Sequence, residues 1–312
     1  MAEFGIDVKK MPLGKISRSQ VLVGYEVLRD IEKVIQSNDP DKKFKLLTLS
    51  NKFYTIVPTD FGRRKVELID TFTRLKQKMN QVEALLDIGV ANNLMKSDDS
   101  VTQLHRSDAH YKSLCAKVEP MSTYSRDFKM ISRYLNNGYD SEALGYNIKL
   151  LNLFKVEREG EEERFAAMRG IKRKLVWHGS RMCNWASILN QGLRIAPPEA
   201  PMTGYLFGKG IYFADRVSKS APFCHATPDN SKALLMLCDV ALGDSYELKK
   251  PQYIEDLPQG KLSTLVLAKT VPDPKKDEIN SEKAVVPLGP GIPTNIPDVF
   301  VEDQEYVVYD AK

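Results

Sequence analysis

The spacing of apolar residues changes once along this chain, and the change limits the folds that it can adopt. Residues 1–97 carry apolar side chains at intervals of three and four, which is the period of a helix with one buried face. Ser17 and Gln20 precede the first stripe with the spacing of a capping box. The members of that stripe are Val21, Tyr25, Leu28, Ile31 and Ile35. This part of the chain therefore predicts helices.

A second helix is expected to begin with Asp39 as its N-cap and Pro40 at its first position, where the missing N–H costs nothing. Its apolar face consists of Leu46, Leu49, Phe53 and Ile56. The stretches 65–79 and 80–95 continue the same period. The sequence predicts a helical bundle without strands over 1–97.

The pattern differs after the polar stretch 96–110, which has no apolar stripe. One amphipathic helix is expected within 122–135, with an apolar side formed by Tyr124, Phe128, Ile131 and Leu135. The other apolar runs are short, and Pro- and Gly-rich turn signals separate them. These runs cover 147–158, 172–179, 210–215, 233–243, 264–270 and 305–310. Because helices and strands do not alternate strictly, residues 105–312 predict a mostly antiparallel sheet, and the whole chain an α+β fold of two domains.

Composition and cysteine spacing limit the class of protein. The net charge of +4 is compatible with a nucleic-acid setting without arguing for one. The cysteines form no C-x-x-C pair, and no histidine stands at zinc-finger spacing, so reduced thiols and no metal are expected. They are Cys115, Cys183, Cys224 and Cys238. Since no signal peptide or transmembrane-length run is evident, we expect a soluble intracellular protein.

The segment "KLVWHGS" reads as the end of a buried strand. His178 at the mouth of a strand is able to exchange hydrogen bonds with a ligand hydroxyl. Gly179 permits close approach of a ligand to the backbone. On this fragment alone, a core-edge histidine bonded to backbone is the simpler interpretation.

The segment "GYLFGKGIYFADRVSKSAPFCHA" places two aromatic residues and a hydroxyl close together in sequence. Tyr212 and Phe223 could stack on a flat ring such as a carboxamide-bearing pyridine, and Ser220 could orient it. Pro222 is tolerable in this helix only if the helix begins near Ser218. A plain strand–helix core explains the same spacing. Glu305, before the last apolar run, is of interest only if it faces His178 across a cleft.

Two nucleotide-binding motifs are missing from the sequence. "GYLFGKG" lacks the glycine spacing and the Ser or Thr of a phosphate-binding loop. No G-x-G-x-x-G fingerprint occurs, so a Rossmann-type dinucleotide site is not expected.

Taken together, these segments resemble the catalytic region of the poly(ADP-ribose) polymerases over nearly the whole chain. The resemblance includes "MPLGKIS", "LLDIGVA", "FKVEREGE", "LVWHGSR", "VSKSA", "DVALGDSYEL", "TVPDP", "VPLGPGI" and "EYVVYD". Its most specific part is "GLRIAPPEAPMTGYLFGKGIYFAD", residues 192–215. The chain looks like the DNA-strand-break-activated nuclear polymerases rather than their mono-ADP-ribosylating relatives. This resemblance implies a helical regulatory domain followed by an ADP-ribosyltransferase domain.

The resemblance also implies roles for individual residues. His178, Tyr212 and Glu305 match the family's catalytic triad, and the glutamate is tied to chain elongation. Gly179 and Ser220 match the positions that hold the nicotinamide carboxamide. Ser180, Asn184 and Arg194 match the adenosine side of the NAD+ pocket. Tyr205 matches the donor-site loop, and Lys219 matches a position beside the catalytic glutamate.

The chain departs from the family pattern in three places. Phe223 replaces the second stacking tyrosine, so the ring remains but its hydroxyl contact is lost. Pro222 replaces an ordinary helix residue and is expected to shift that wall slightly. The chain ends at Lys312, where relatives continue for about another strand, so a C-terminal strand is expected to be missing.

The function implied by the resemblance is transfer of ADP-ribose from NAD+ to acceptor proteins, including the enzyme itself, with elongation into polymer and release of nicotinamide. NAD+ is the substrate, no metal is implied, and DNA acts only through domains absent from this chain. A nuclear location and a role in the DNA-damage response go with it. The alternatives are a mono-ADP-ribosyltransferase and a non-catalytic scaffold or nucleic-acid adaptor that responds to NAD+.

Overall fold

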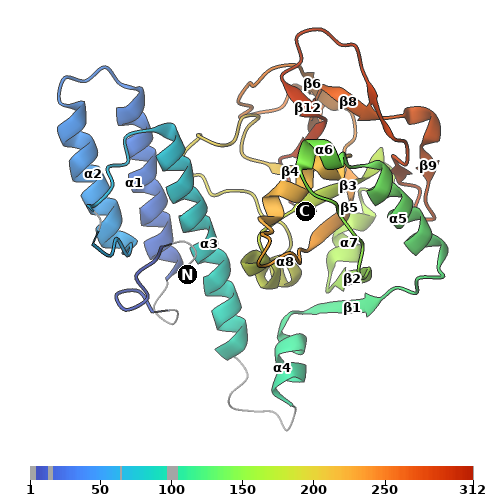
Figure 1. Ribbon diagram of the computed structural model, residues 1–312, viewed down its shortest axis with the longest axis horizontal. Helices are drawn as coiled ribbons and strands as arrows, with labels where there is room; N and C mark the ends of the chain where they lie inside the picture. The colour runs from blue at the N-terminus through green and yellow to red at the C-terminus, as the bar shows by residue number, and fades with distance from the viewer. Residues whose placement is uncertain (1–4, 13–16, 64, 97–104, 312) are drawn as a thin grey trace. The chain divides into compact units, whose positions relative to one another are not determined.

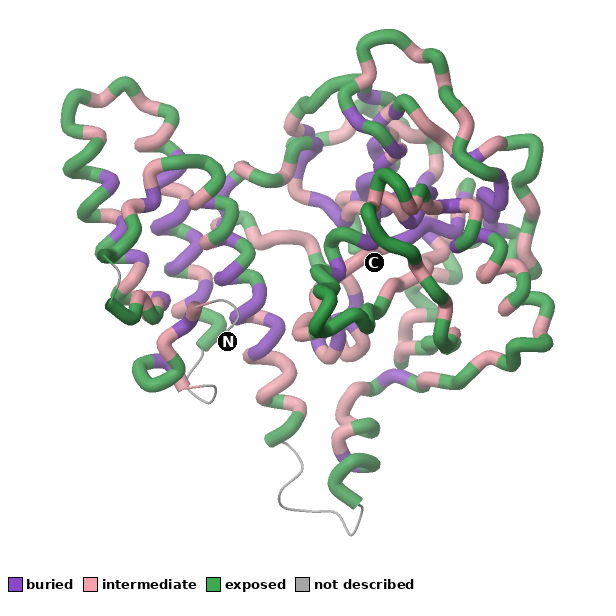
Figure 2. Tube along the Cα trace, viewed as in Figure 1, coloured by how far each residue is buried: buried purple, intermediate pink, exposed green. Residues whose placement is uncertain are grey.

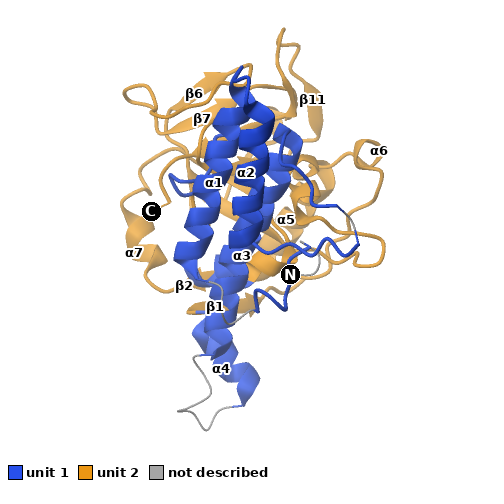
Figure 3. Cartoon of the chain, turned by 90° about the vertical axis from the view of Figure 1, so that its left-hand side faces the viewer, with its two compact units in different colours: residues 1–114, 186–192, 196–206 blue, residues 115–185, 193–195, 207–312 orange. Residues whose placement is uncertain are grey.

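A computed structural model describes residues 5–12, 17–63, 65–96 and 105–311 of the chain (Figure 1). The chain forms two compact units, coloured separately in Figure 3. The first contains residues 1–114, 186–192 and 196–206, and the second contains 115–185, 193–195 and 207–312. The boundary predicted between 97 and 105 lies outside the described residues.

The first unit is built on long helices, as the apolar period predicts. They are α1 (Arg18–Gln36), α2 (Lys42–Ile56), α3 (Phe72–Lys96) and the short α4 (Arg106–Ser113). Their apolar faces form one core that contains Tyr25, Leu28, Phe53, Leu75 and Leu85. Figure 2 shows buried residues recurring at intervals along these helices.

The start of α1 agrees with its predicted cap. The Ser17 hydroxyl accepts the N–H of Gln20 at 3.1 Å, which satisfies one of the free donors of the first turn. The Gln20 amide donates to the Ile56 carbonyl at 2.7 Å instead of returning to Ser17. This side chain therefore ties the start of α1 to the end of α2.

The predicted start of α2 was wrong by two residues. The helix begins at Lys42, and its N-cap is Asp41. Asp39 instead accepts the N–H of Asp41 at 2.8 Å, the local bond by which an aspartate forms a turn. The stretch 65–79 was also only partly correct, because α3 begins at Phe72 and then continues unbroken to Lys96.

Two segments from later in the chain belong to the first unit. Ala200, from the segment 196–206, is buried in the helical core, and Tyr205 packs against that core. The segment 186–192 contains most of α8 (Trp185–Gln191). The helices thus hold a loop that stands far from them in sequence.

The second unit contains the sheets predicted from the short apolar runs. The main sheet has the order β6-β7-β13-β4-β3-β10-β9, with β5 also pairing with β3. Its strands are β3 (Arg173–Gly179), β4 (Ile211–Ala214), β5 (Leu235–Ala241), β6 (Ser245–Leu248), β7 (Ser263–Val266), β9 (Glu278–Ile279), β10 (Val285–Val286) and β13 (Glu305–Val308). The pairs β3–β10 and β6–β7 are parallel, and the others are antiparallel. The α+β fold with a mostly antiparallel sheet is confirmed.

Two smaller sheets complete this unit. One is an antiparallel ribbon of β1 (Ala116–Pro120) and β2 (Phe154–Arg158). The other has the order β11-β8-β12, formed by β11 (Gly291–Pro293), β8 (Ala268–Pro272) and β12 (Val301–Asp303). The predicted run 264–270 is therefore divided between β7 and β8, which belong to different sheets.

Short helices connect and cover these strands. They are α5 (Arg126–Asn137), α6 (Ser141–Leu144), α7 (Glu161–Ala166), α9 (Val217–Ser220) and the 3₁₀ turns η3 (Met182–Asn184), η4 (Ala221–Cys224) and η5 (Pro274–Lys276). Tyr134 of α5 is fully buried against Trp177 of β3. Tyr124, predicted on the apolar side of α5, instead precedes the helix and is 86% exposed.

Within the described residues, no helix has both the length and the apolar composition needed to cross a membrane.

Candidate active site

The neighbouring strands β4 and β13 carry two of the three predicted catalytic residues. In their antiparallel ladder Glu305 lies opposite Ala214, and Val307 lies opposite Tyr212. Directly opposed residues share a face of the sheet, and alternate residues along a strand return to it. Tyr212 and Glu305 therefore project from the same face of the sheet.

Two hydrogen bonds fix the hydroxyl of Tyr212. Its hydroxyl donates to the Gly208 carbonyl at 2.7 Å and accepts the N–H of Phe207 at 3.1 Å. Burial raises the pKa of Tyr212 well above its usual value, so the phenol stays protonated. The ring is held as an oriented aromatic surface.

His178 lies at the end of β3, one residue after Trp177, the residue at which β3 pairs with β4. Its Nδ1 lies 2.9 Å from the Tyr212 carbonyl. A carbonyl can only accept, so Nδ1 carries the hydrogen. Burial lowers the pKa of His178, against the opposite effect of this hydrogen bond. A neutral ring then keeps the Nε2 lone pair available to accept a bond from a ligand hydroxyl.

The Glu305 carboxylate is held by one cation. The residue is 8% exposed, and Lys219 Nζ lies 2.7 Å from its Oε1. Lys219 comes from α9, so an ion pair joins that helix to the start of β13. Sequence analysis predicted both residues, and the structure brings them together.

Gly179 and Ser220 approach each other through their backbones. A Cβ built on Gly179 would lie 1.9 Å from the Ser220 carbonyl oxygen and 3.3 Å from Cys224 Sγ. No side chain fits in that space, so the contact requires glycine. Among the described residues, it is the Ser220 backbone that lies this close to Gly179, and the approach of a ligand to Gly179 stays a prediction.

The Ser220 hydroxyl is buried and donates to the Trp177 carbonyl at 3.0 Å. Its lone pairs remain able to accept an amide N–H. After Ser220 the chain changes from α-helix to the 3₁₀ turn η4, in which Pro222 occupies the first turn. This early position is the one that Pro222 was predicted to need. Phe223 follows with 54% of its surface exposed.

The residues predicted for the adenosine side all belong to the second unit. The Asn184 amide donates to the Ser180 hydroxyl at 3.0 Å, so these two lie together in the second unit. Arg194 also belongs to the second unit, whereas Tyr205, predicted for the donor-site loop, belongs to the first. Among the described residues, one hydrogen bond joins His178 to β4 and an ion pair joins Glu305 to α9, but no bond joins His178 to Glu305 directly.

Sequence reasoning missed a second ion pair near Glu305. Arg216 Nη1 donates to Asp303 Oδ1 at 2.6 Å, and both side chains are less than a tenth exposed. Burial raises the pKa of Asp303, and the Arg216 guanidinium opposes that rise. The two residues are 87 positions apart, so no local spacing could have indicated this pair.

A buried polar network also lies behind the strands of the site. The Tyr306 hydroxyl donates to Asp215 Oδ2 at 2.8 Å, and Lys174 Nζ lies 2.9 Å from the same hydroxyl. Asp215 is 1% exposed, and burial raises its pKa to about 6. Lys174 of β3 and Tyr306 of β13 are thus linked to Asp215, the residue that directly follows β4.

In the first unit, the loop 196–206 is held by a buried carboxylate of α1. Glu32 is 5% exposed and accepts the N–H groups of Met202 at 3.0 Å and Thr203 at 2.6 Å. The Thr203 hydroxyl donates to the same carboxylate. Gly204, with a φ of +95°, lies against the aliphatic part of Lys76 on α3. Tyr205 therefore follows directly on a segment that the helices hold.

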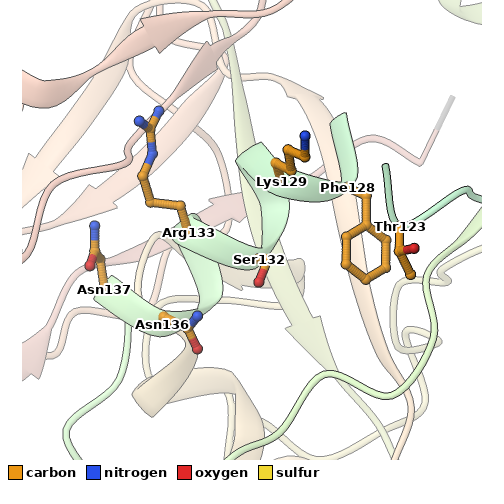
Figure 4. A pocket seen from close by; sticks show the side chains of 7 residues that line it. All are labelled: Thr123, Phe128, Lys129, Ser132, Arg133, Asn136 and Asn137. Atoms are coloured by element: carbon orange, nitrogen blue, oxygen red, sulfur yellow. The ribbon is translucent and has the colours of Figure 1, made fainter. Parts of the chain in front are cut away.

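A hollow of about 450 Å³ lies along α5, and none of the residues predicted for the site lines it (Figure 4). Its lining consists of Thr123, Phe128, Lys129, Ser132, Arg133, Asn136 and Asn137. Arg133 pairs with Glu278, and the Asn137 amide donates to the Leu288 carbonyl at 2.7 Å.

In the described parts of the chain, no group of three His, Cys, Asp or Glu side chains is arranged to hold a metal ion.

Two family models match the chain. The poly(ADP-ribose) polymerase regulatory domain matches residues 1–111, and the poly(ADP-ribose) polymerase catalytic domain matches residues 125–312. The second match includes all the predicted site residues, together with the loop that Glu32 holds.

Curated relatives are similar over the full length of the chain. Poly(ADP-ribose) polymerase 1 of Gallus gallus is 42% identical over 312 residues, which are 100% of this chain and 31% of that protein. Poly(ADP-ribose) polymerase 2 of Arabidopsis thaliana is 43% identical over 316 residues, covering 100% of this chain and 49% of that protein. The corresponding protein 2-B of Oryza sativa subsp. japonica is 43% identical over 317 residues and is covered to 52%.

The chain thus spans from about a third to about half of the curated relatives that it matches. The catalytic-domain match extends over more than half of the chain, and the regulatory-domain match covers the helices that precede it. On this evidence the chain belongs to the poly(ADP-ribose) polymerase family and contains the regulatory and the catalytic domain of that family.

Proposed function

We propose that this chain transfers ADP-ribose from NAD+ to acceptor proteins, itself included, and extends it into poly(ADP-ribose) with release of nicotinamide. Membership of the family supports the reaction class. The observation that carries the assignment is the buried Glu305 carboxylate, ion-paired with Lys219 at 2.7 Å and on the same sheet face as Tyr212. A carboxylate in that setting is suited to stabilise positive charge on a ribose.

Cleavage of the bond between ribose and nicotinamide passes through an oxocarbenium-like state. The leaving nicotinamide is neutral, so the site does not need to protonate it. It needs to hold the ring, stabilise charge on the sugar and admit an acceptor hydroxyl. In this proposal Tyr212 and Phe223 stack on the ring, while the Gly179 backbone and the Ser220 hydroxyl bind the carboxamide.

The ribose is assigned to the other two residues of the triad. His178 accepts a hydrogen bond from a ribose hydroxyl at Nε2, because its Nδ1–H is already donated to the Tyr212 carbonyl. Glu305 accepts a second hydroxyl and places negative charge beside the developing cation. During elongation the same carboxylate orients or deprotonates the acceptor hydroxyl. Ser180, Asn184 and Arg194 are assigned to the adenosine part of NAD+, and Tyr205 to the donor-site loop.

The helical unit is proposed to restrain NAD+ binding. The support is the grip of Glu32 on the loop 196–206, which contains Tyr205 and forms part of the catalytic-domain match. Rearrangement of this loop around a ligand would break the hydrogen bonds to Glu32, and the free energy of that step lowers the affinity for the ligand. A nuclear location, a role in the DNA-damage response and activation through further DNA-binding domains are proposed by likeness to the relatives.

The test is to incubate the chain with labelled NAD+, measure free nicotinamide and separate the labelled protein on a gel. The proposal expects nicotinamide release with a ladder of polymer. A single labelled band would instead favour a mono-ADP-ribosyltransferase. Absence of nicotinamide release, with tight NAD+ binding retained, would favour a non-catalytic NAD-responsive scaffold.

A further inference from the structure

Two ion pairs join the segment 216–219 to the segment 303–305, in which β12 ends and β13 begins. Arg216 and Lys219 are three residues apart, and the N–H of Lys219 donates to the Arg216 carbonyl at 3.2 Å, which closes one turn. Residues three apart on a turn lie on the same side of it. Asp303 ends β12 and Glu305 begins β13, with one residue between them. Arg216 pairs with Asp303, and Lys219 pairs with Glu305.

The Arg216–Asp303 pair is enclosed more completely than the pair beside it. Its side chains are 9% and 8% exposed, whereas those of Lys219 and Glu305 are 30% and 11% exposed. A Cβ on Gly291 would lie 2.8 Å from Arg216 Cζ, so the β11 backbone closes one side of the guanidinium. Among the described residues, Arg216 Nε is buried without a hydrogen-bond partner. The Asp303 carboxylate is therefore the group that neutralises the buried Arg216 guanidinium.

Lys219 is within electrostatic reach of both carboxylates. Burial raises the pKa of Asp303, Arg216 opposes the rise most strongly, and Lys219 opposes it as well. Glu302, also near, adds to the rise, but its own partner is the exposed Lys269. The cations Arg216 and Lys219 thus face the anions Asp303 and Glu305. Because Arg216 pairs closely with Asp303, Lys219 pairs with Glu305.

We infer that Arg216 and Asp303 are positioning residues for Glu305: their ion pair fixes the corner between β12 and β13 and keeps Lys219 on the Glu305 carboxylate. The inference rests on the proposed function, because it deepens the role given to Glu305. Neither residue needs to touch the substrate. They affect the reaction by fixing the position of the Glu305 carboxylate and by keeping the positive charge of Lys219 beside it.

The first variant is Arg216→Gln, which leaves the buried Asp303 carboxylate without its partner. Lys219 is then the nearest remaining cation and is drawn from Glu305 toward Asp303. Because a misplacement of about 1 Å in a catalytic group costs about a hundredfold in rate, we expect kcat for nicotinamide release to fall by about that factor. KM for NAD+ should change little, since the groups assigned to ring and adenosine binding are untouched.

The second variant is the double substitution Arg216→Gln with Asp303→Asn, which removes both charges. Lys219 then has a single anion to pair with, so kcat should recover by about tenfold or more over Arg216→Gln alone, a coupling that a double-mutant cycle measures. Arg216→Lys provides a variant that keeps the charge. It should retain the fold and show a smaller loss of kcat, and it decides the matter if Arg216→Gln does not fold.

The matched control is Arg173→Gln, which breaks another ion pair of the same unit, Arg173–Asp239 at 2.5 Å, in which the Arg173 side chain is buried and Asp239 is partly buried. It should lower the melting temperature without a selective loss of kcat. The inference is overturned if folded Arg216→Gln or Arg216→Lys turns over like the unsubstituted chain, or if the double variant is no faster than Arg216→Gln. If the unsubstituted chain releases no nicotinamide, the proposed function itself has failed.

Discussion

Glu305 begins a strand, a position where acidic side chains are usually solvated, but only 8% of this residue is exposed. The sequence shows the residue and its motif, but its burial depends on Lys219 and on the neighbouring strands β4 and β7. The same holds for Gly179, whose contact with Ser220 arises only when α9 folds back on β3. The sequence motifs therefore indicated the candidate residues, whereas the contacts of Glu305 with Lys219 and of Gly179 with Ser220 could be seen only in the folded structure.

We expect Glu305→Gln to bind NAD+ nearly as well as the unsubstituted chain but to form no long polymer. The amide has the shape of the carboxylate and lacks its charge, and loss of one preorganised group costs about a hundredfold or more in rate. Nicotinamide release and a polymer gel measure both effects. Glu302→Gln is the control, because Glu302 is exposed and pairs with Lys269. Long chains from Glu305→Gln would contradict its assigned role.

At the scale of elements, the strands β3, β4 and β13 share the buried Asp215 network. The pKa of Asp215 is about 6 in the folded chain and 3.8 in the unfolded one. As the pH falls, the folded state binds this proton first, so the stability from Asp215 is present below about pH 4 and is lost as the pH rises through about 6. Lys174, Tyr306 and Asp303 are the groups that face it.

The test is Asp215→Asn, which has no proton to bind here. From about pH 4 to about pH 6 the free energy of unfolding of the unsubstituted chain should fall relative to the variant by about 2 kcal/mol, most of the roughly 3 kcal/mol that a pKa difference of about two units supplies over the full titration. Urea unfolding at several pH values measures this difference. Other titrating groups cancel in the comparison, and a difference that stays constant with pH would contradict the assignment.

The loop 196–206 and helix α1 form another pair of elements whose contact is testable. Glu32→Gln keeps the side-chain shape and removes the charge that accepts three hydrogen bonds. Hydrogen bonds to a charged group contribute about 1.5–3 kcal/mol each, so we expect a looser loop and a rise of about tenfold in basal nicotinamide release. Glu26→Gln on the exposed side of α1 is the control. Equal basal rates in both variants would contradict the restraint.

For the whole molecule, the change in apolar spacing predicted the α+β fold and the order of its parts. The short apolar runs predicted most strands of the second unit. Sequence spacing could not show that the segments 186–192 and 196–206 belong to the helical unit, since Ala200 gains its burial only from helices remote in sequence. Nor could it divide the run 264–270 between two sheets, because each half finds its own partner strand.

Deletion of residues 1–97 should raise nicotinamide release in the absence of DNA. The helices that hold the loop are then gone, and the cost of rearranging the loop around NAD+ falls. The measurement is the basal rate of the deleted chain against the full chain at equal concentrations of folded protein. Adding Glu305→Gln to the deleted chain checks that the same site is active. An unchanged basal rate would remove the case for an autoinhibitory bundle.

The backbone contact between Gly179 and Ser220 also governs how this chain can vary. In a saturation library, position 179 should return only glycine after selection for folded protein, since even alanine would overlap a carbonyl oxygen. Phe223, 54% exposed, should accept many replacements. An inhibitor anchored on main-chain atoms at 179 would therefore be hard to escape by resistance mutations there, whereas one that depends on stacking against Phe223 would be easy to escape.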